Sequence, residues 1–519
     1  METVQANILS AFLQAAEAHP EAVALIHDNR QLTYRQLLTE VEQSAAFFRK
    51  KGLQKGDKVL VFVPMSLALY RTVLALLYLG ACPVFLDGWV GIKLLRECLK
   101  TVPCKGIIAP PLFLALSWAI KDLRQLPVRL STRVGTAEGV DNLSPAAVFP
   151  ESTALVTFTT GSTGTPKAAD RTHAFLAAQL QALSPLLQTV PSPCLTTLPI
   201  VVLLHLAAGR TTLLPTKAFK ITKTESYPAL LEDVFRKGVR AIIGSPSVLK
   251  GMVTAANGKF SSLQTVEEIL TGGGPVYPAL AAAMKQAFPH AKINAVYGST
   301  EAEPISHIDA GTLAHFSPEA VLEGGLPVGI PDTSAQVRIV KMEAACSQIK
   351  TAEALDAATL PENSVGEILV SGDHVLQHYI HNPEAEAEVK IWIGKTVWHR
   401  TGDCGRLDMN GSLYFMGRCK DVFWWHGKQY FPDLINYYLS RQLQDVAVAV
   451  LFYNNRPLVL FENAVPVPPE VLTQLLAFCQ LSEAAIAVVP EIPRDPRHHT
   501  KIDYAALHNR VRYDALTWM

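Results

Sequence analysis

The chain of 519 residues lacks an excess of charge and any organised cysteine pattern. Lysine plus arginine and aspartate plus glutamate both number 46, so the formal net charge is zero. This balance argues against a broad nucleic-acid or anionic-membrane footprint and leaves only local basic patches open. The eight cysteines form neither a Cys-x-x-Cys pair nor a Cys/His metal spacing. Such scattered cysteines are typical of reduced thiols in a cytoplasmic protein.

Targeting and membrane-spanning signals are also lacking. The first residues include acids and no basic stretch before an apolar run, so we expect no signal peptide. The most apolar early window, residues 67–86, contains Arg71 and a Gly-Ala-Cys-Pro break, which predicts a buried helix followed by a strand. No internal repeat is visible, and a chain of this length accommodates about three domain-sized units.

What the sequence does contain is a repeated alternation of short apolar strands and amphipathic helices. Thr33 is the predicted N-cap of the first of these helices. Strands are predicted at 58–64, 83–86, 154–160, 241–246 and 293–298, and helices at 31–50, 66–79, 174–187 and 280–288. This alternation predicts an α/β fold with doubly wound sheets.

The later part of the chain differs in character. After about residue 325 it is strand-rich with short turns, and residues 446–461 predict a hairpin around Asn454-Asn455. We therefore expect a large N-terminal domain over 1–418, of which about 325–418 is a β-rich subdomain. A small α+β domain is expected over 419–519.

The stretch TFTTGSTGTPKAAD at 157–170 is suited to phosphate binding but is not a Walker A loop. From Gly161 the sixth position is Pro166, and Lys167 is followed by Ala168, whereas a Walker A loop needs Gly-Lys-Ser/Thr there. Its glycines allow close backbone approach, its hydroxyls can donate to phosphate oxygens, and Lys167 adds positive charge. Its residues alone leave two readings open: a ligand loop between a strand and a helix, or a polar surface loop.

Two further stretches carry residues suited to a nucleotide. In NAVYGSTEAEPIS (294–306), Tyr297 can stack on a base and Glu301 can hold a hard cation, or the acid is coincidental. In HRTGDCGRLDMNGSLYFMGRCKD (399–421), Asp403 suits a ribose diol, or it is an ordinary turn acid.

A fourth stretch, EIPRDPRHHTKIDYAAL (491–507), places Lys501 in a basic, turn-prone tail. On its own this stretch indicates a solvated run of charges.

Together, the order and content of these four stretches resemble the adenylate-forming superfamily of acyl-CoA synthetases, peptide-synthetase adenylation domains and luciferases. The similarity covers nearly the whole chain and includes LTYRQLL, KGDKVLVFVP, LGACPVFLD and Gly272-Gly273-Gly274-Pro275. The strings YGSTEAEPIS, IIGSPSVL, LPIVVLLHLAAGRTTLLP and DPRHHTKI are similar to the branch that contains olefin-pathway β-lactone synthetases.

The resemblance implies roles for single residues. Lys501, on a small mobile C-terminal domain, is expected to be catalytic, with Thr300 at the α-phosphate, Glu301 at Mg²⁺ and Lys420 at the hinge. The expected ATP- and AMP-binding residues are Thr159, Thr160, Gly161, Ser162, Thr163, Gly164, Thr165, Lys167, Gly272, Gly273, Gly274, Pro275, Tyr297, Gly298, Ser299, Asp403 and Arg418. The expected acyl pocket includes His205, Gly244, Ser245, Glu303 and Pro304.

Three positions depart from the family pattern. Ala168 stands where the family usually has Gly, and Thr500 replaces the usual Gly before the catalytic lysine. His205 lies three residues later than the family's aromatic-His segment, so it is either an acyl gate or an ordinary lining or core residue.

The implied function is ATP-dependent activation of a hydrophobic carboxylic acid to acyl-AMP, with release of pyrophosphate. Transfer to CoA or to a carrier phosphopantetheine thiol then follows, and an acyl carrier protein is a candidate partner. One alternative is closure of a β-hydroxyacyl-AMP to a β-lactone. The others are a non-catalytic nucleotide- or acyl-binding homologue and a kinase-like phosphotransferase. The expected cofactors are ATP and Mg²⁺, and no nucleic-acid partner is expected.

Overall fold

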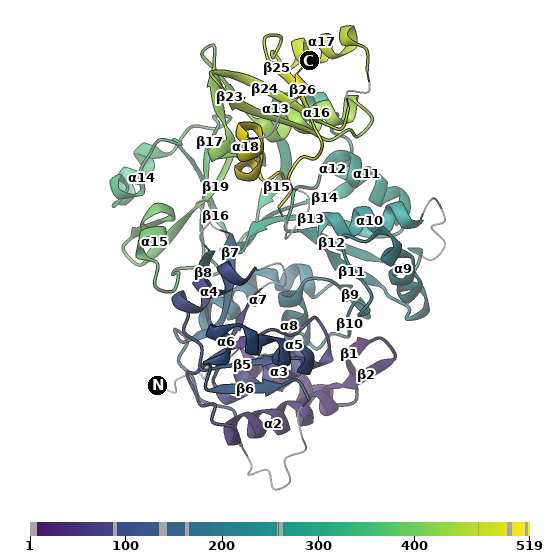
Figure 1. Cartoon of the computed structure of the whole chain (residues 1–519), viewed down its shortest axis with the longest axis vertical. Coiled ribbons are helices and arrows are strands. Elements are labelled where there is room, and N and C mark those ends of the chain that lie inside the picture. Colours follow the sequence, from purple (N-terminus) through teal and green to yellow (C-terminus); the bar gives the residue numbers. More distant parts are fainter. Residues whose placement is uncertain are drawn as a thin grey trace.

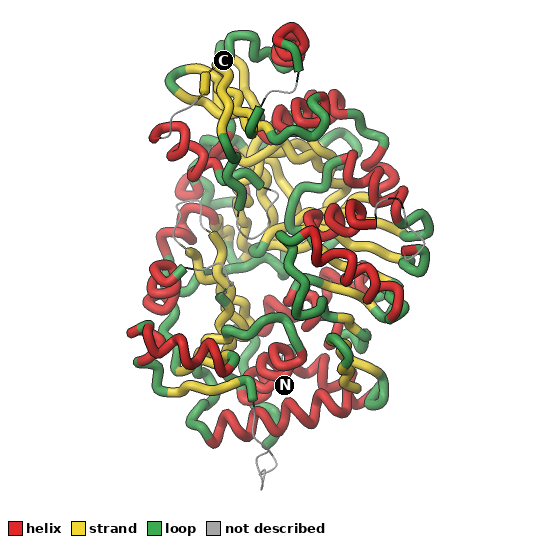
Figure 2. The backbone as a smooth tube through the Cα atoms, turned by 45° about the vertical axis from the view of Figure 1, so that its right-hand side comes forward, coloured by secondary structure: helices red, strands yellow, loops and turns green. Residues whose placement is uncertain are grey.

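The computed structural model shows strands in the interior of the molecule and helices on its outside (Figure 2). Three regions follow one another along its long axis, coloured purple to blue, teal to green, and yellow (Figure 1). The described residues are 8–86, 91–133, 143–160, 166–256, 258, 263–464, 467–495, 501–513 and 517–518.

The first region is built on a six-stranded sheet. Its central strands run parallel and are buried, because helices cover the sheet on its faces. In order across the sheet the strands are β6 (Val128–Ser131), β5 (Gly106–Ala109), β3 (Lys58–Val61), β4 (Cys82–Phe85), β7 (Thr153–Thr160) and β8 (Pro166–Thr172). The helices of this region are α1 (Leu9–Ala18), α2 (Tyr34–Lys50), α3 (Leu67–Leu79), α4 (Ile92–Thr101), α5 (Pro111–Leu116), α6 (Lys121–Arg124), α7 (His173–Leu187) and α8 (Pro199–Ala207).

A second, larger sheet begins with a mainly parallel half. Its strands are β2 (Arg30–Thr33), β1 (Val23–His27), β10 (Thr212–Leu213), β9 (Cys194–Thr196), β11 (Ala241–Gly244), β12 (Glu268–Gly272) and β13 (Lys292–Ser299). The helices that follow in this part of the chain are α9 (Tyr227–Arg236), α10 (Pro246–Ala256), α11 (Pro278–Ala287), α12 (Ala310–Ala314) and α13 (Pro318–Gly324).

The strand-rich segment after residue 325 continues this same sheet with antiparallel pairs. β14 (Ala302–Asp309) joins the parallel half to this segment. The strands of the segment, in order across the sheet, are β15 (Leu326–Pro331), β20 (Leu413–Arg418), β19 (Thr396–Leu407), β17 (Gly366–Ser371) and β16 (Gln336–Val340), and β18 (Lys390–Ile393) pairs with β19. Two short helices, α14 (Ala352–Ala358) and α15 (Pro383–Val389), lie in the connections. The strand-rich segment is thus joined edge to edge to the parallel half, with β13 and β14 at the junction.

The last region places helices against a small sheet, as expected for an α+β unit. Its four-stranded sheet contains β23 (Val448–Tyr453), β24 (Arg456–Glu462), β25 (Ala485–Val489) and β26 (Thr517–Trp518), and a separate pair consists of β21 (Phe423–Trp425) and β22 (Lys428–Tyr430). The helices are α16 (Pro432–Gln442), α17 (Pro469–Phe478) and α18 (Tyr504–Tyr513). No helix in the described part of the chain is long and apolar enough to cross a membrane.

Local sequence signals explain two of these elements. Thr33 caps α2 through a capping box, because its hydroxyl accepts from the Gln36 amide (3.2 Å) while the Gln36 side chain accepts from the Thr33 amide (3.0 Å). Asn454 and Asn455 have φ of 49° and 61°, which a tight turn between β23 and β24 requires. Both features confirm the sequence predictions.

Removing the cap of α2 tests the link between this local signal and stability. Thr33→Ala is expected to lower the free energy of unfolding by about 1 kcal/mol, because the Gln36 amide loses its hydrogen-bond partner. Thr39→Ala, on the exposed face of the same helix, is the matched control and should leave stability unchanged or slightly higher. Urea unfolding followed by circular dichroism measures both. An unchanged midpoint for Thr33→Ala would show that packing alone fixes this helix.

Candidate active site

The structure gathers residues of all four sequence stretches around one large cleft. Its volume is about 2020 Å³, and its walls come from the two large sheets and from the C-terminal region. Lys167, Glu301, Asp403, Arg418 and Lys501 all line it, although they are spread over more than half of the chain. The cleft is therefore the candidate active site.

Asp403 lies at the centre of the nucleotide-like part of the cleft. It faces Arg418 across the β19–β20 pair, and the Arg418 guanidinium lies 2.9 Å from its Oδ1 atom. The hydroxyl of Tyr297, at the end of β13, donates to its Oδ2 atom (2.7 Å). The expected base-stacking tyrosine and the expected ribose pair thus form one bonded group.

The Gly-Gly-Gly-Pro segment follows β12 and contributes to the same wall. Gly273, Gly274 and Pro275 line the cleft, and Gly273 has φ of 84°, which favours glycine. Gly272 lies behind them, because a Cβ atom there would approach the carbonyl oxygen of Val296 to 2.8 Å. The close approach of β12 to β13 therefore requires this glycine.

The stretch predicted to bind phosphate joins two strands. The sequence placed it between a strand and a helix, but β8 intervenes before α7 begins at His173. Thr159 and Thr160 end β7 and pair with Lys167 and Pro166 of β8. The predicted residues Gly161, Ser162, Thr163, Gly164 and Thr165 lie outside the described residues.

Ala168, the departure from the family pattern, has an ordinary place in β8. It is fully buried, and its carbonyl oxygen accepts from the Ile380 amide (2.9 Å). It is not among the described residues with positive φ, so this position does not need a glycine.

Lys167 is the buried cation of this stretch. Its side chain is only 8% exposed, its Nζ atom lies 3.9 Å from Glu388, and it is 5.5 Å from the centre of the Tyr379 ring. Because the Lys167 side chain is already ordered, it loses little conformational entropy when it binds a phosphate.

Sequence reasoning missed a strap of residues, 375–380, that links Lys167 to Glu301. On one side Ile380 and His378 bond the backbone of β8. On the other side the Leu376 amide donates to the Glu301 carbonyl (2.7 Å), and the Tyr379 hydroxyl donates to Oε1 of Glu301 (2.9 Å). The strap fixes the distance between the two charged residues. Its only signal in the sequence was an aromatic residue after a Gly-Asp turn.

Lys390 anchors the strap from behind and does not line the cleft. Its Nζ atom donates to the Leu376 carbonyl and lies 5.7 Å from the centre of the Tyr379 ring. The pKa of Lys390 is lowered to about 7, chiefly by burial and also by the nearby Lys167, while Glu301 and Glu386 act in the opposite direction.

Lys501 reaches the cleft from the C-terminal region. Burial lowers its pKa, as does the neighbouring Arg418, whereas Asp403 raises it. Asp433, in the first turn of α16, lines the same wall, and burial raises its pKa to about 6. The C-terminal region is held here partly by Tyr437 of α16, whose ring stacks on Tyr277 at 4.2 Å.

Of the residues predicted for the acyl pocket, only Glu303 lines the cleft. Burial raises its pKa, and nearby Arg171 opposes that shift. Gly244, Ser245 and Pro304 lie behind the lining residues among the described parts of the chain.

His205 is also absent from the lining of the described cleft. It is fully buried, its Nδ1 atom lies 3.1 Å from the Thr212 hydroxyl, and burial lowers its pKa to about 4. This placement is that of a core residue, the second of the two readings left open by the sequence. The wall near it is formed by apolar residues of α8, among them Pro199, Ile200 and Val201.

The acidic residues of the cleft fit a magnesium ion better than a transition metal. No cluster of three or more His, Cys, Asp or Glu side chains suited to a metal occurs in the described structure. Mg²⁺ typically takes one or two carboxylates together with water and substrate phosphates. Glu301 is the candidate ligand, because it lines the cleft and Tyr379 holds its Oε1 atom in place.

Comparison with known proteins agrees with this geometry. Residues 12–380 match the family described as AMP-binding enzyme. An olefin beta-lactone synthetase of Stenotrophomonas maltophilia is 29% identical over 444 residues, which cover 79% of this chain and 79% of that protein. A feruloyl-CoA synthase of Amycolatopsis is 27% identical over 429 residues, covering 81% and 80%.

Solved structures share the whole architecture. The O-succinylbenzoate coenzyme A synthetase of Bacillus subtilis in complex with AMP aligns with a TM-score of 0.79 at 20% identity, over 98% of this chain and 99% of that one. The same synthetase in complex with ATP and a magnesium ion aligns with a TM-score of 0.75 at 20% identity, over 93% and 96%.

The bond between Tyr379 and Glu301 can be tested separately from the rest of the cleft. Tyr379→Phe is expected to raise the Mg²⁺ concentration needed for nucleotide binding about tenfold, because a hydrogen bond to a charged group contributes about 1.5 kcal/mol. Tyr414→Phe is the matched control, since that hydroxyl bonds Asp408 (3.4 Å) outside the cleft. Titration of Mg²⁺ at fixed ATP, with nucleotide binding as the readout, measures both. Equal Mg²⁺ dependence in the two variants contradicts a positioning role for Tyr379.

Proposed function

The chain belongs to the family of AMP-binding enzymes, and on this premise we propose how the residues of its cleft divide the reaction. The enzyme activates a carboxylic acid with ATP. The carboxylate oxygen attacks the α-phosphorus, the bond to the bridging oxygen of the β-phosphate breaks, and acyl-AMP and pyrophosphate result. The observation that carries the assignment of residues is that one cleft collects Lys167, Glu301, Asp403, Arg418 and Lys501.

The nucleoside is bound by the group centred on Asp403. Tyr297 stacks on adenine, and the Asp403 carboxylate accepts hydrogen bonds from the ribose hydroxyls while Arg418 holds it in place. Because the Tyr297 hydroxyl is bonded to the same carboxylate, base and ribose are positioned together.

The phosphates lie between Lys167 and the Thr300–Glu301 turn. Lys167 supplies positive charge, and Thr300 supplies a hydroxyl at the α-phosphate. Glu301 would hold Mg²⁺, which when bound neutralises charge on the phosphate oxygens. The strap keeps Glu301 and Lys167 at a fixed separation before the nucleotide arrives.

Lys501 is the catalytic residue in this scheme. Its ammonium group lies on the wall shared with Asp403 and Arg418, where it meets the carboxylate and the α-phosphate as negative charge builds up in the transition state. A single contact of this kind is worth about 3–4 kcal/mol.

The C-terminal region then moves to admit the acceptor. We place the hinge at Lys420, in the short turn Cys419–Asp421 between β20 and β21, and the domain boundary at 418/419. The motion withdraws Lys501, which is attached to the moving part, and leaves acyl-AMP in the N-terminal part.

The acid is hydrophobic, because α8 gives the cleft an apolar wall with Ile200 and Val201. The acceptor is the thiol of CoA or of a carrier phosphopantetheine, which attacks the acyl carbon and releases AMP. The similarity to a feruloyl-CoA synthase supports this step. The free state of all eight cysteines supports a reducing, cytoplasmic setting.

A second candidate is lactone closure, supported by the similarity to an olefin beta-lactone synthetase. In this case the β-hydroxyl of the substrate attacks its own acyl carbon and AMP leaves without a thiol. Glu303 and Arg171 give the cleft wall polar groups that suit a hydroxylated acid.

Lys501→Ala tests the catalytic assignment. Formation of acyl-AMP, followed by mass spectrometry in single-turnover reactions, is expected to fall about 100-fold or more, because one transition-state contact is lost. ATP binding, measured by calorimetry, should remain nearly intact. Lys428→Ala, an exposed lysine of the same region, is the control. A Lys501→Ala rate within about tenfold of the parent would remove Lys501 from its assigned role.

Product analysis separates the two acceptors. Incubation with ATP and a mixed pool of hydrophobic acids and their 3-hydroxy derivatives, with and without CoA, is followed by mass spectrometry. A thioester that forms only with CoA supports thiol transfer. A product that has lost water from the hydroxy acid and forms without CoA supports lactone closure and contradicts thiol transfer as the main reaction.

A further inference from the structure

Residues 91–133 differ in charge from the rest of the chain. They contain eight lysines and arginines and two acids, although the whole chain is neutral. The segment includes α4, α5, the 3₁₀ turn Ser117–Ala119 and α6, together with β5 and β6 at one edge of the first sheet. A local excess of positive charge is thus concentrated on one part of the surface.

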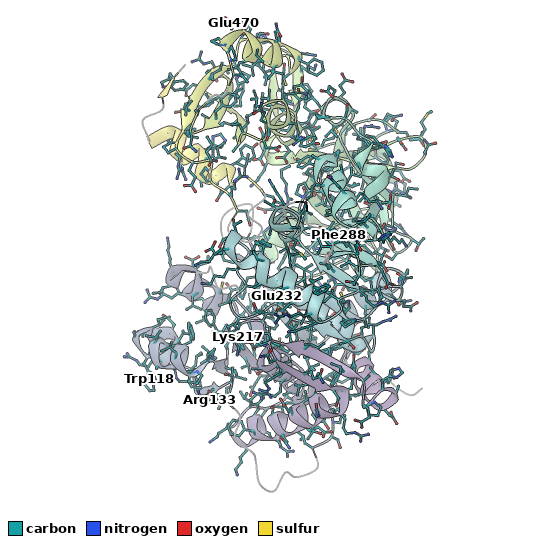
Figure 3. All side chains as sticks on the ribbon, turned by 90° about the vertical axis from the view of Figure 1, so that its right-hand side faces the viewer. Trp118, Arg133, Lys217, Glu232, Phe288 and Glu470 are labelled. Atoms are coloured by element: carbon teal, nitrogen blue, oxygen red, sulfur yellow. The ribbon has the colours of Figure 1, made fainter. Side chains whose placement is uncertain are left out.

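The same segment presents large apolar side chains to solvent. Leu112 is 74% exposed, Leu116 is 63% exposed and Trp118 is 58% exposed. Leu112 and Leu116 lie four residues apart in α5 and so share one face, and Trp118 follows in the next turn. Trp118 lies at the outer margin of the molecule, with Arg133 on the same side (Figure 3).

These exposed side chains sit on a firmly held base. Phe113 of α5 stacks on Phe62 with ring centres 3.9 Å apart, so the inner face of α5 belongs to the core. Arg129 lies 5.0 Å from the centre of the Trp118 ring and donates to the Ser117 hydroxyl (2.6 Å). A segment that is apolar on its inner and its outer face is not explained by burial in the fold alone.

A basic rim, made of Lys93, Lys121 and Arg124, lies on the neighbouring helices α4 and α6. Lys121 and Arg124 lie exposed on α6, directly after the 3₁₀ turn. Arg96 of α4 pairs with Asp122 of α6 at 3.0 Å, which brings α4 beside α6 and engages one of the two acids. Lys93 lies three residues before Arg96, so it shares its face of α4.

The combination of exposed apolar side chains and basic side chains limits which partner can bind this surface. A second copy of the chain in a symmetric dimer would place the basic rim against itself, which costs electrostatic energy. A nucleic-acid backbone complements the charge but leaves the leucines without an apolar partner. A lipid surface with anionic headgroups complements both, since apolar side chains enter the headgroup boundary and lysines and arginines meet lipid phosphates.

We propose that Leu112, Leu116 and Trp118, with the rim of Lys93, Lys121 and Arg124, form a docking surface for an anionic lipid bilayer. The tryptophan sits at the interface between water and hydrocarbon, where its ring and its N–H group are both satisfied. The inner side of α4 lines the cleft through Leu94 and Cys98, so the docking surface and the cleft share one helix. The proposal does not rest on the acid or the acceptor that the enzyme uses.

Flotation of the full chain with vesicles tests the apolar part. Vesicles of phosphatidylcholine with phosphatidylglycerol are expected to bind the protein, and binding should weaken as salt rises. The triple variant Leu112→Ser/Leu116→Ser/Trp118→Ser should bind about tenfold or more weakly, because three side chains no longer enter the interface. Phe235→Ser on α9, 59% exposed in the parent, is the matched control and should bind normally. Circular dichroism confirms that each variant is folded.

The charged rim is tested with the double variant Lys121→Glu/Arg124→Glu on the same vesicles. At low salt, where the parent binds the anionic vesicles, the double variant should not bind them. The parent should bind vesicles of pure phosphatidylcholine poorly. The proposal is overturned if the parent does not float, if it binds both vesicle types equally, or if the triple variant binds as well as the parent. It is also overturned if the parent does not bind vesicles but sediments as a dimer, and the triple variant sediments as a monomer. The surface would then join two copies of the chain.

Discussion

The carboxylate of Asp403 is the point on which the arrangement of the cleft depends. It is almost fully buried. Tyr297 of β13, the last parallel strand, and Arg418 of β20, which pairs with the strand of Asp403, hold it in place. A buried charge is stable only when such partners surround it. The group therefore locks the junction between the parallel half of the large sheet and its antiparallel extension, and it does so at the edge where the C-terminal region brings in Lys501.

The strap at 375–380 performs the same task for the phosphate side of the cleft. It connects β8, which carries Lys167, to the turn that carries Glu301, and Lys390 supports it from behind. Two sheets that belong to different regions of the molecule are thus held at one spacing by a short segment of backbone. Preorganisation of this kind lowers the cost of binding a highly charged substrate, because few groups need to be ordered on arrival.

The sequence predicted the alternation of strands and helices well, because short apolar runs mark the strands at 58–61, 241–244 and 292–299. Asp403, Arg418 and Glu301 were also predicted as site residues, because they lie in sequence motifs that resemble a known family. The three residues line the cleft together.

Other features depend on tertiary packing that no local pattern records. Tyr379 acts on Glu301, 78 residues away in the chain, and Lys390 acts through the strap, so spacing gave no sign of either residue. His205 stood in a familiar string, but the three-residue offset puts it in the core against Thr212. The strand β8 was hidden because PKAADRT is too polar to stand out as a strand.

The central claim is that this cleft joins a carboxylic acid to the α-phosphorus of ATP. The most direct measurement is isotope exchange of labelled pyrophosphate into ATP in the presence of a panel of hydrophobic carboxylic acids. The account predicts exchange that depends on both Mg²⁺ and an acid. An enzyme that binds ATP but shows no exchange with any acid, or that accumulates ADP in place of AMP, would contradict it.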